Sequence, residues 1–343
     1  MALAKIRPRI SVYQYATFAM PGIAKDHNNF QERFPQMATT TLELPYEQVR
    51  ELLHQSCTSI SPDVLYLMKQ AAAKETSVEA KTFLETMLKN VELAGQQDKP
   101  VCQSPGYPSV WIRWGDAMQP NLGNLTGNLT RAVIESTKAG YIRPSIVHPL
   151  TRFNPGDSSG VGVPNYELRY QKDLPYCEIV VSAKGCGAEL PNVAKILTPA
   201  TLGKNYKGLK KLVLDTIVGN SGFIGARGFP CPPFSIGIGI GGQMDVAAKL
   251  SREAISTRSW LDHNPDPLFD ELEQELLADI NKLKNGPAGI GGDTTALAVK
   301  IGWASTHTAI CPVVINFHCW VARRFGIRFY PDGHTEKLFQ VGE

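Results

Sequence analysis

Between Pro45 and Gly95, apolar residues recur at steps of three and four, which is the spacing of one face of an α-helix. Pro45 and Pro62 stand where helices can begin, and Gly95 stands where one can end. The pattern predicts an N-terminal helical layer, which we interpret as scaffold. Its clearest apolar stripe consists of Ala80, Phe83, Leu84, Met87, Leu88 and Val91.

After Pro100 the pattern changes to short apolar runs separated by helical periods. Residues 110–114 (Val-Trp-Ile-Arg-Trp) alternate in the way that indicates a strand. Strands that alternate with helices predict a mixed α/β body after the helical layer. Further strands are predicted at 178–182, 235–240, 296–299 and 312–316, and helices at about 207–219, 243–257 and 267–284.

The sequence divides into two parts by the periodicity of its apolar residues. Residues 1–40 contain Pro8, Pro21 and Pro35 with little periodicity, and we expect them to form an arm that packs on the body or on a partner. Residues 41–343 are predicted to form one domain. Within it, residues 150–165 read as a long polar loop.

Composition and charge exclude several classes of protein. The chain has 343 residues, of which 43% are hydrophobic and 20% charged, as in ordinary globular proteins. Its net charge of +3 is too small to indicate a nucleic-acid-binding surface. No apolar run reaches the roughly 18–20 residues that span a bilayer, and the N-terminus lacks the apolar core of a secretory signal. We expect a cytoplasmic protein with neither nucleic acid nor membrane as a partner.

Three of the seven cysteines, Cys102, Cys231 and Cys319, stand in glycine- and proline-rich turns far apart in sequence. They cannot form a zinc ribbon, which needs closely spaced pairs. They suit a site assembled by folding, in which three thiolates hold an iron–sulfur cluster and leave one iron open as a Lewis acid. Three others lie in apolar patterns and are predicted to be buried packing residues: Cys57, Cys177 and Cys311.

Two glycine-rich segments are candidates for contact with an anion. Residues 237–242 (Gly-Ile-Gly-Ile-Gly-Gly) fit the dinucleotide-binding pattern but do not open a domain, so we interpret them as a turn beside a small charged substrate. Residues 184–189 (Lys-Gly-Cys-Gly-Ala-Glu) are compatible with an amide nest for a carboxylate and equally with a plain turn. Cys186 in this segment competes as a cluster ligand.

Arginines and histidines supply the remaining candidates. A guanidinium binds a carboxylate through two parallel hydrogen bonds, and Arg143 is favoured because it precedes a proline in a turn. His318 adjoins Cys319, but neighbouring strand residues point to opposite faces, so a supporting role is expected. The other candidates are Arg152, Arg323, Arg324, His148 and His307.

Several motifs occur in a fixed order: Cys102-Gln103, Arg143-Pro-Ser-Ile-Val-His-Pro-Leu, Asn154-Pro-Gly-Asp157, Lys184-Gly-Cys-Gly-Ala-Glu-Leu-Pro, Cys231-Pro-Pro-Phe, 286–295 (Gly-Pro-Ala-Gly-Ile-Gly-Gly-Asp-Thr-Thr) and Cys319-Trp-Val-Ala-Arg-Arg. This order resembles the iron–sulfur hydro-lyase family of class I fumarases and L-tartrate dehydratases, specifically its α subunit or N-terminal domain. The resemblance covers roughly residues 45–335.

The resemblance implies that residues 41–343 are an α-type catalytic domain, in which three cysteines hold a 4Fe–4S cluster whose open iron binds substrate. The implied cluster ligands are Cys102, Cys231 and Cys319. Gln103 and Arg143 match positions that contact substrate, and the turn from Lys184 to Gly187 matches one that lines the site. It further implies a separate β-type subunit that closes the site, and therefore a hetero-oligomer.

One departure from the family affects the expected substrate. The family pattern Cys-Gln-Asp-Thr-Gly is Cys102-Gln-Ser-Pro-Gly106 here, so Ser104 replaces a carboxylate and Pro105 stiffens the turn. We therefore expect a hydro-lyase for a tartrate- or malate-like hydroxy acid rather than fumarate, with Gln103, Ser104 and Arg143 as catalytic candidates. The alternative is a non-catalytic cluster-binding or assembly paralogue of the same fold.

Overall fold

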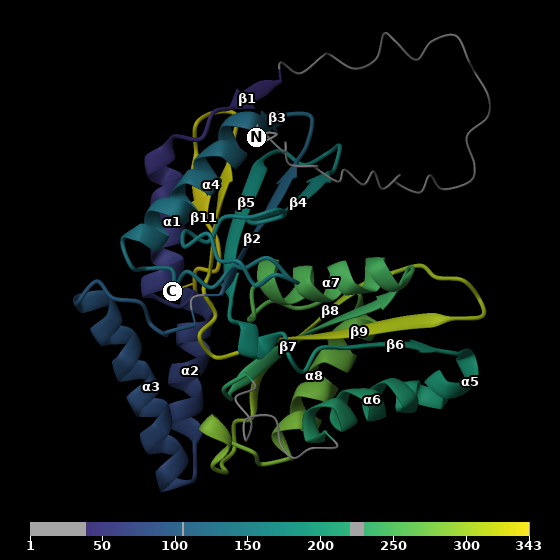
Figure 1. The fold of residues 1–343 in the computed structure, drawn as a ribbon. Helices are drawn as coiled ribbons and strands as arrows, with labels where there is room; N and C mark the ends of the chain where they lie inside the picture. The colour runs from purple at the N-terminus through teal and green to yellow at the C-terminus, as the bar shows by residue number, and fades with distance from the viewer. Residues whose placement is uncertain (1–38, 105, 220–229, 343) are drawn as a thin grey trace, which may run out of the picture.

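The computed structural model describes residues 39–104, 106–219 and 230–342, and Figure 1 shows two mixed sheets, one above the other, with helices on both sides. The helices are α1 Tyr46–Thr58, α2 Pro62–Lys74, α3 Val78–Gln96, α4 Leu122–Lys138, α5 Pro199–Leu202, α6 Lys207–Val218, α7 Met244–Thr257 and α8 Pro267–Asn281. The strands are β1 Thr40–Leu42, β2 Tyr107–Trp114, β3 Met118–Pro120, β4 Asn165–Tyr170, β5 Cys177–Lys184, β6 Val193–Leu197, β7 Phe234–Gly241, β8 Ala296–Ala304, β9 Cys311–His318, β10 Arg324–Phe329 and β11 Thr335–Lys337. The predicted α/β class is confirmed.

The first sheet has the strand order β11-β10-β5-β2-β4, antiparallel except for the parallel pair β2 and β4. Helices α1 and α4 cover one face of it (Figure 1). Apolar side chains of both helices meet those of β2 and β5, as with Leu53 and Leu129 against Ile112 and Ile179. Burying such side chains is the main stabilising term, because each removes apolar surface from water.

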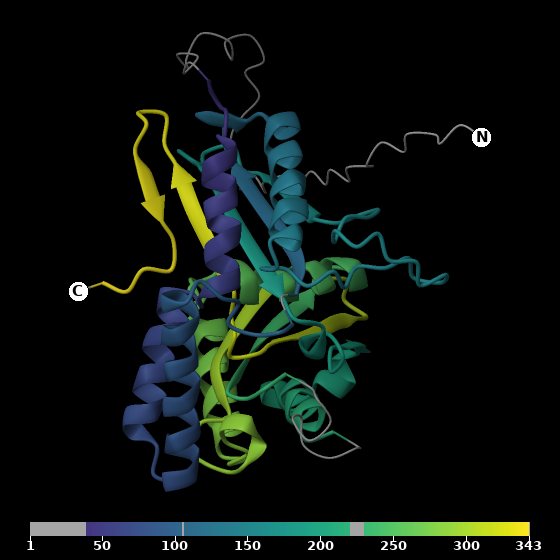
Figure 2. The same cartoon turned by 60° about the vertical axis from the view of Figure 1, so that its left-hand side comes forward.

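The second sheet has the order β6-β9-β7-β8, in which β7 is parallel to β8 and antiparallel to β9. Helices α6 and α8 pack on one face through Val213, Leu276 and their neighbours. Helix α7 packs on the other face and lies between the two sheets (Figures 1 and 2). The predicted helices and strands of this region are thus all present, although α8 ends at Asn281 rather than 284.

The glycines of residues 237–242 pack a helix against a strand. A Cβ on Gly237 would lie 2.0 Å from Ser251 O, and one on Gly239 would lie 1.8 Å from Ala247 O, both on α7. The interpretation of this segment as a turn beside substrate is therefore wrong for these two residues. Gly241 and the residue after it do turn, but they lie at the far end of β7 from Cys231, roughly 20–25 Å along the strand.

The predicted helical layer divides between the two halves of the molecule. Helix α1 covers the first sheet, whereas α2 and α3 form a hairpin that packs on Ile255, Trp260 and the segment after β9 (Figure 2). Pro45 caps α1, and Pro62 is the first residue of α2, as predicted. Phe83 departs from the predicted stripe, because it is 44% exposed while Leu84 beside it is buried.

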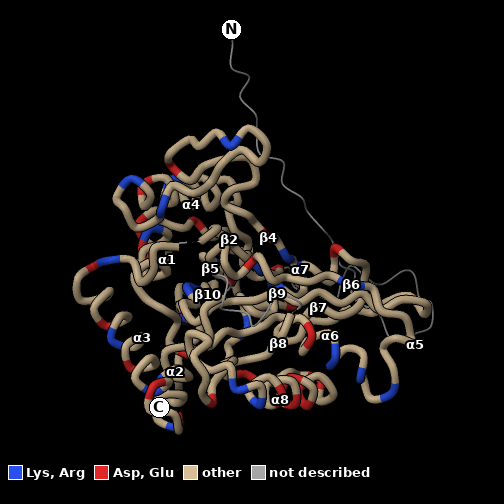
Figure 3. Tube along the Cα trace, turned by 60° about the horizontal axis from the view of Figure 1, so that its bottom comes forward, with Lys and Arg blue, Asp and Glu red and all other residues tan. Residues whose placement is uncertain are grey.

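The predicted arm, residues 1–40, lies outside the described residues apart from its last two, which lead into β1. The predicted loop at 150–165 is present between α4 and β4 (Figure 2). None of the described helices is long and apolar enough to cross a membrane. Figure 3 shows lysines of α6 beside acidic residues of α8, and Lys210 pairs with Glu275 between them.

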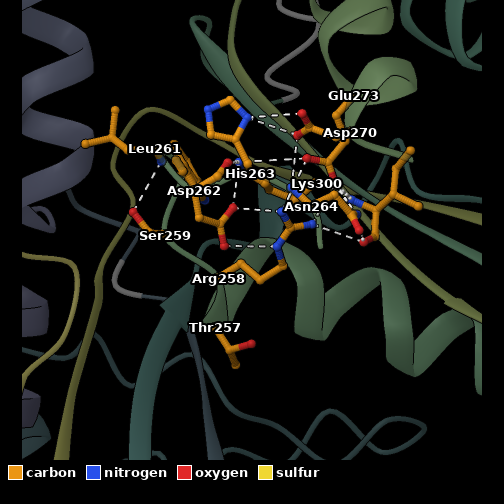
Figure 4. A network of polar contacts seen from close by, with 12 residues as sticks. Thr257, Arg258, Ser259, Leu261, Asp262, His263, Asn264, Asp270, Glu273 and Lys300 are labelled. Carbon is orange, nitrogen blue, oxygen red and sulfur yellow. Dashed lines mark hydrogen bonds and ion pairs between the residues drawn. The ribbon is translucent and has the colours of Figure 1, made fainter. Parts of the chain in front are cut away.

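A polar network fixes the connection between α7 and α8 (Figure 4). Arg258 bonds Asp262 at 2.7 Å and Glu273 at 2.6 Å, and Lys300 of β8 donates to Asp262 O at 2.6 Å. Glu273 and Lys300 are buried, so their charges require these partners.

Arg324 extends this network into the core. Its Nη1 donates to Arg258 O, and its Nη2 pairs with Asp63, with both side chains fully buried. Its guanidinium also lies over the rings of Trp260 and Phe339, with centroid distances of 4.6 and 4.4 Å. Asp63 lies in the first turn of α2, so the ion pair ties the helical hairpin to the start of β10.

Replacing Asp63 with asparagine should destabilise the chain by about 3–5 kcal/mol, because it leaves the buried Arg324 without a counter-charge. Urea unfolding of the wild type and the Asp63→Asn variant measures the effect. Lys211→Met is the control, since the Lys211–Asp215 pair is exposed and its loss should leave stability nearly unchanged. Equal midpoints for all three proteins would contradict this account of the ion pair.

Candidate functional site

The loop that carries Cys102 is held between two helices. Val101 N donates to Cys57 O at the end of α1 (3.0 Å), and Asn90 of α3 donates to Val101 O (2.8 Å). Beyond it the backbone turns around the sulfur, because Ser104 N donates to Cys102 Sγ at 3.5 Å. The Gln103 side chain is exposed and lies beside the same sulfur, with its Oε1 3.3 Å away.

The loops of Cys231 and Cys319 lie next to each other because β7 and β9 are antiparallel. Cys231 precedes β7 and Cys319 follows β9, and Trp320 N donates to Cys231 O at 3.4 Å. The glycine-rich segment 286–295 supports the Cys231 loop, since Ala288 N donates to Pro232 O at 3.0 Å. That segment is in turn held to α2, because Glu75 accepts from Asp293 N at 2.9 Å.

Arg323 joins the loops of Cys102 and Cys319. It lies four residues after Cys319, and its Nη2 donates to Ser104 O while its Nε donates to Ala183 O at 3.1 Å. The chain thus brings three thiols from separate layers into one region.

The thiols act on one another electrostatically. The pKa of Cys319 is raised to about 11, mainly by burial; Arg323 opposes the shift, while Cys231 and Cys102 add to it. Burial, and then Cys102, raises the pKa of Cys231. The three sulfurs therefore lie within electrostatic range of one another.

The three thiols of Cys102, Cys231 and Cys319 fit an iron–sulfur cluster better than a single metal ion. Among the described residues, no three His, Cys, Asp or Glu side chains lie close enough to hold one metal ion. In a four-iron cluster each thiolate binds a different iron, so the sulfurs stand further apart. All seven cysteines are unpaired, and Cys102, Cys231 and Cys319 are partly or fully exposed.

The other four cysteines divide as their sequence context suggests. Cys57, Cys177 and Cys311 are buried in α1, β5 and β9, as predicted. Cys186 is exposed in the 3-10 turn Cys186–Ala188.

The turn at Lys184 packs directly on the Cys102 loop. A Cβ on Gly106, which has a φ of +89°, would lie 2.4 Å from the Lys184 carbonyl group. A Cβ on Gly185 would lie 3.1 Å from Ser104 Oγ. Only glycine fits at position 106, because the Lys184 backbone approaches too closely for a side chain, whereas a side chain at position 185 would be in tight contact with the Ser104 hydroxyl. Gly187 follows in a half-buried 3-10 turn, and Pro105 lies outside the described residues.

Lys184 is a buried cation with two polar partners. Its Nζ donates to Asn316 Oδ1 and pairs with Glu189 Oε1 at 3.0 Å, and Arg252 pairs with the same carboxylate. Burial lowers the pKa of Lys184 to about 8, while Glu189 opposes the shift. Burial alone would raise the pKa of Glu189, but Lys184 and Arg252 lower it.

Other predicted residues lie away from the cysteines. Arg143 is exposed in the loop between α4 and β4, where its guanidinium has no hydrogen bond or ion pair with a described residue. Arg152 and His148 lie in the same loop, where His148 Nδ1 accepts from Thr151 N at 3.1 Å. His307 is exposed at the opposite end of β9 from Cys319.

His318 and the paired arginines are internal. His318 is fully buried, and its Nδ1 donates to Cys319 O at 3.1 Å, which fits a supporting role. Burial, followed by the charge of Lys184, holds its pKa well below the usual value. Arg323 and Arg324 expose 1% and 0% of their surface, so neither can hold a substrate carboxylate as the sequence suggested.

A cavity of about 590 Å³ lies between β4 and α7, and none of the three candidate ligand cysteines lines it. Its charged residues are already paired, as in Arg169 with Glu253 and Lys249 with Glu167. Asn316, the partner of Lys184, forms part of its wall. The cavity therefore reaches the back of the Lys184 turn rather than the thiols.

Comparison with known proteins decides the family. The model described as "Fumarate hydratase (Fumerase)" matches residues 46–328. This chain belongs to the fumarate hydratase family. The match contains the three cysteine loops and the Lys184 turn, and it ends within β10.

Relatives of this family member cover most of its length. The chain is 36% identical to the putative L(+)-tartrate dehydratase subunit alpha of Methanocaldococcus jannaschii, over 80% of this chain and 94% of that one. It is 32% identical to the L(+)-tartrate dehydratase subunit alpha of Escherichia coli K12, over 82% and 89%. It is 30% identical to the putative fumarate hydratase class I of Geobacillus stearothermophilus, over 88% of this chain but 58% of that one.

The lowered pKa of Lys184 predicts a specific dependence of stability on pH. Between its folded pKa of about 8 and its ordinary 10.5, the unfolded chain holds a proton that the folded chain has released. Wild-type stability should therefore rise with pH in this window relative to Lys184→Met, by up to about 1.4 kcal/mol per pH unit. Urea unfolding of both proteins at several pH values measures the difference, and parallel curves would contradict it.

Proposed function

We propose that this chain is the α subunit of a 4Fe–4S-dependent hydro-lyase that reversibly dehydrates a small hydroxy-carboxylic acid of tartrate or malate type. The observation that carries the proposal is the convergence of Cys102, Cys231 and Cys319, from three loops, in a member of the fumarate hydratase family. The named functions of relatives, L(+)-tartrate dehydratase and fumarate hydratase, support the reaction class. The seven unpaired thiols suit the reducing cytoplasm, which we keep as the proposed location.

The bound cluster would supply an open iron as a Lewis acid for the hydroxyl that leaves. The chain's own residues would bind and orient the substrate. Gln103 is exposed beside the Cys102 sulfur, where its amide can hydrogen-bond a substrate. Ser104 presents a hydroxyl rather than a charge on the same loop, next to Gly185. The Lys184 cation behind that turn adds positive potential that favours a carboxylate.

Arg143 completes the proposed substrate-binding set only if its loop is brought over the cysteines. Its guanidinium is exposed and has no hydrogen bond or ion pair with the described residues, so it is free to bind a carboxylate bidentately. We propose that a separate β-type subunit closes this side and contributes the base. The Geobacillus relative supports this arrangement, because this chain spans only 58% of it.

Serine substitution of each proposed ligand should abolish the visible absorbance of the anaerobically reconstituted chain. The three variants are Cys102→Ser, Cys231→Ser and Cys319→Ser. The matched control is Cys186→Ser, which removes an exposed thiol from the neighbouring turn and should retain the absorbance and the iron content. Loss of the cluster in Cys186→Ser together with its retention in Cys231→Ser would show that the ligand set is wrong.

The activity is tested with a panel of hydroxy-diacids and their dehydration products, given to the chain alone and to its complex with the β-type subunit. The complex should turn over, and the chain alone should be nearly inactive because its site stays open to water. Fumarate should be a poor substrate, since Ser104 removes the charge that the family pattern places there.

Each result of the panel decides a separate point. Rapid turnover by the isolated, cluster-loaded chain would overturn the need for a partner. A kcat/KM at least tenfold higher for fumarate and malate, about 1.4 kcal/mol of transition-state binding, would show that Ser104 sets no specificity. A stable cluster with no turnover of any acid would favour the non-catalytic paralogue.

A further inference from the structure

Arg323 has a charge balance unlike that of the other buried cations near the site. Lys184 is paired with Glu189, and Arg324 is paired with Asp63. Arg323 is 1% exposed, and among the described residues no carboxylate pairs with it. A buried guanidinium without a counter-charge is costly, because arginine does not lose its proton in proteins.

The hydrogen bonds of Arg323 use only part of its donor set. Nε donates to Ala183 O at 3.1 Å, and Nη2 donates to Ser104 O. Its Nη1 is buried and has no partner in the described structure. These two carbonyl groups are neutral, so they satisfy donors without neutralising the charge.

The groups that act electrostatically on this guanidinium are thiols. They are Cys319, Cys102 and Cys57, in that order of strength. Cys319 and Cys102 are two of the proposed cluster ligands, while Cys57 is a buried residue of α1 whose backbone carbonyl holds Val101. The guanidinium that lacks a counter-charge and keeps an unused donor therefore lies within electrostatic range of two of the proposed cluster ligands.

We propose that Arg323 is the internal counter-charge of the cluster: it fastens the Cys102 loop to the Cys319 loop and balances the negative charge of the cluster thiolates from the protein side. The inference rests on the proposed function, because the charge arises only when the thiolates bind iron. Arg323 is a positioning residue, since its burial keeps it from the substrate. It should favour the reduced cluster, which carries one more negative charge.

The test is the reduction potential of the anaerobically reconstituted full chain, measured by dithionite titration with an electron paramagnetic resonance readout. Arg323→Gln should shift the ratio of reduced to oxidised cluster at least tenfold toward oxidised, which is about 59 mV for one electron. Arg323→Lys keeps the charge, so its ratio of reduced to oxidised cluster should stay within tenfold of the wild-type ratio. Arg131→Gln is the control for loss of a distant exposed cation on α4.

A second measurement addresses the joining of the loops without the cluster. Hydrogen–deuterium exchange of the apo chain should be faster in Arg323→Gln for peptides that span the Cys102 loop and the Lys184 turn, and unchanged for peptides of α4. Arg323→Lys should also exchange faster there, because one ammonium group cannot hold both Ser104 O and Ala183 O. Unchanged exchange in both variants would overturn the joining role.

The outcomes separate this inference from the proposed function. An unchanged potential in Arg323→Gln, or an equal fall in Arg323→Lys, overturns the counter-charge role while the function stands. If Arg323→Gln does not fold, the test rests on Arg323→Lys. A shift of its ratio of reduced to oxidised cluster by more than tenfold toward oxidised overturns the proposal. A wild-type chain that takes up no cluster contradicts the function and the charge role together, and the exchange result then decides the joining of the loops.

Discussion

Two adjacent buried arginines hold the centre of this molecule together. Arg324 pairs with Asp63 and stacks on two aromatic rings, so it fixes the α2–α3 hairpin against the first strand after the Cys319 loop. Arg323 reaches the other way, to Ser104 O and Ala183 O, and fixes the Cys102 loop against the end of β5. Neighbouring residues on an extended chain point to opposite sides, which lets one dipeptide clamp two layers.

The second sheet brings the remaining loop to the same place. Ser235 of β7 lies opposite His318 of β9, so the residues just outside this pair, including Cys231 and Cys319, must lie at one edge. Gly237 and Gly239 let α7 approach β7 closely enough that the two sheets share this helix. The site is therefore a consequence of antiparallel pairing and close helix packing, rather than of any one motif.

Local signals in the sequence predicted the elements well and the long-range contacts poorly. Periodicity and the prolines at 45 and 62 located the helices, because those signals act within a few residues. The glycines at 237 and 239 were misinterpreted, since a glycine needed for packing and one needed for anion contact look the same in sequence. The sequence suggests Arg323 as a group that could bind a substrate carboxylate, because its burial depends on partners some 140 and 219 positions away that carry no local signal. The pairing of Lys184 with Asn316 likewise carries no local signal.

The departure at Ser104 and the charge of Arg323 are linked by geometry. Ser104 Oγ and Arg323 Nη2 both lie within 3.5 Å of the point that a Gly185 Cβ would occupy. A carboxylate at position 104, as in the family pattern, would place a negative charge in the neighbourhood of this guanidinium. With serine there, no described carboxylate compensates the cation, and the thiols of Cys102 and Cys319 are the nearest groups that can. Serine at position 104 therefore affects the proposed substrate site and, through Arg323, the electrostatic environment of the proposed cluster at the same time.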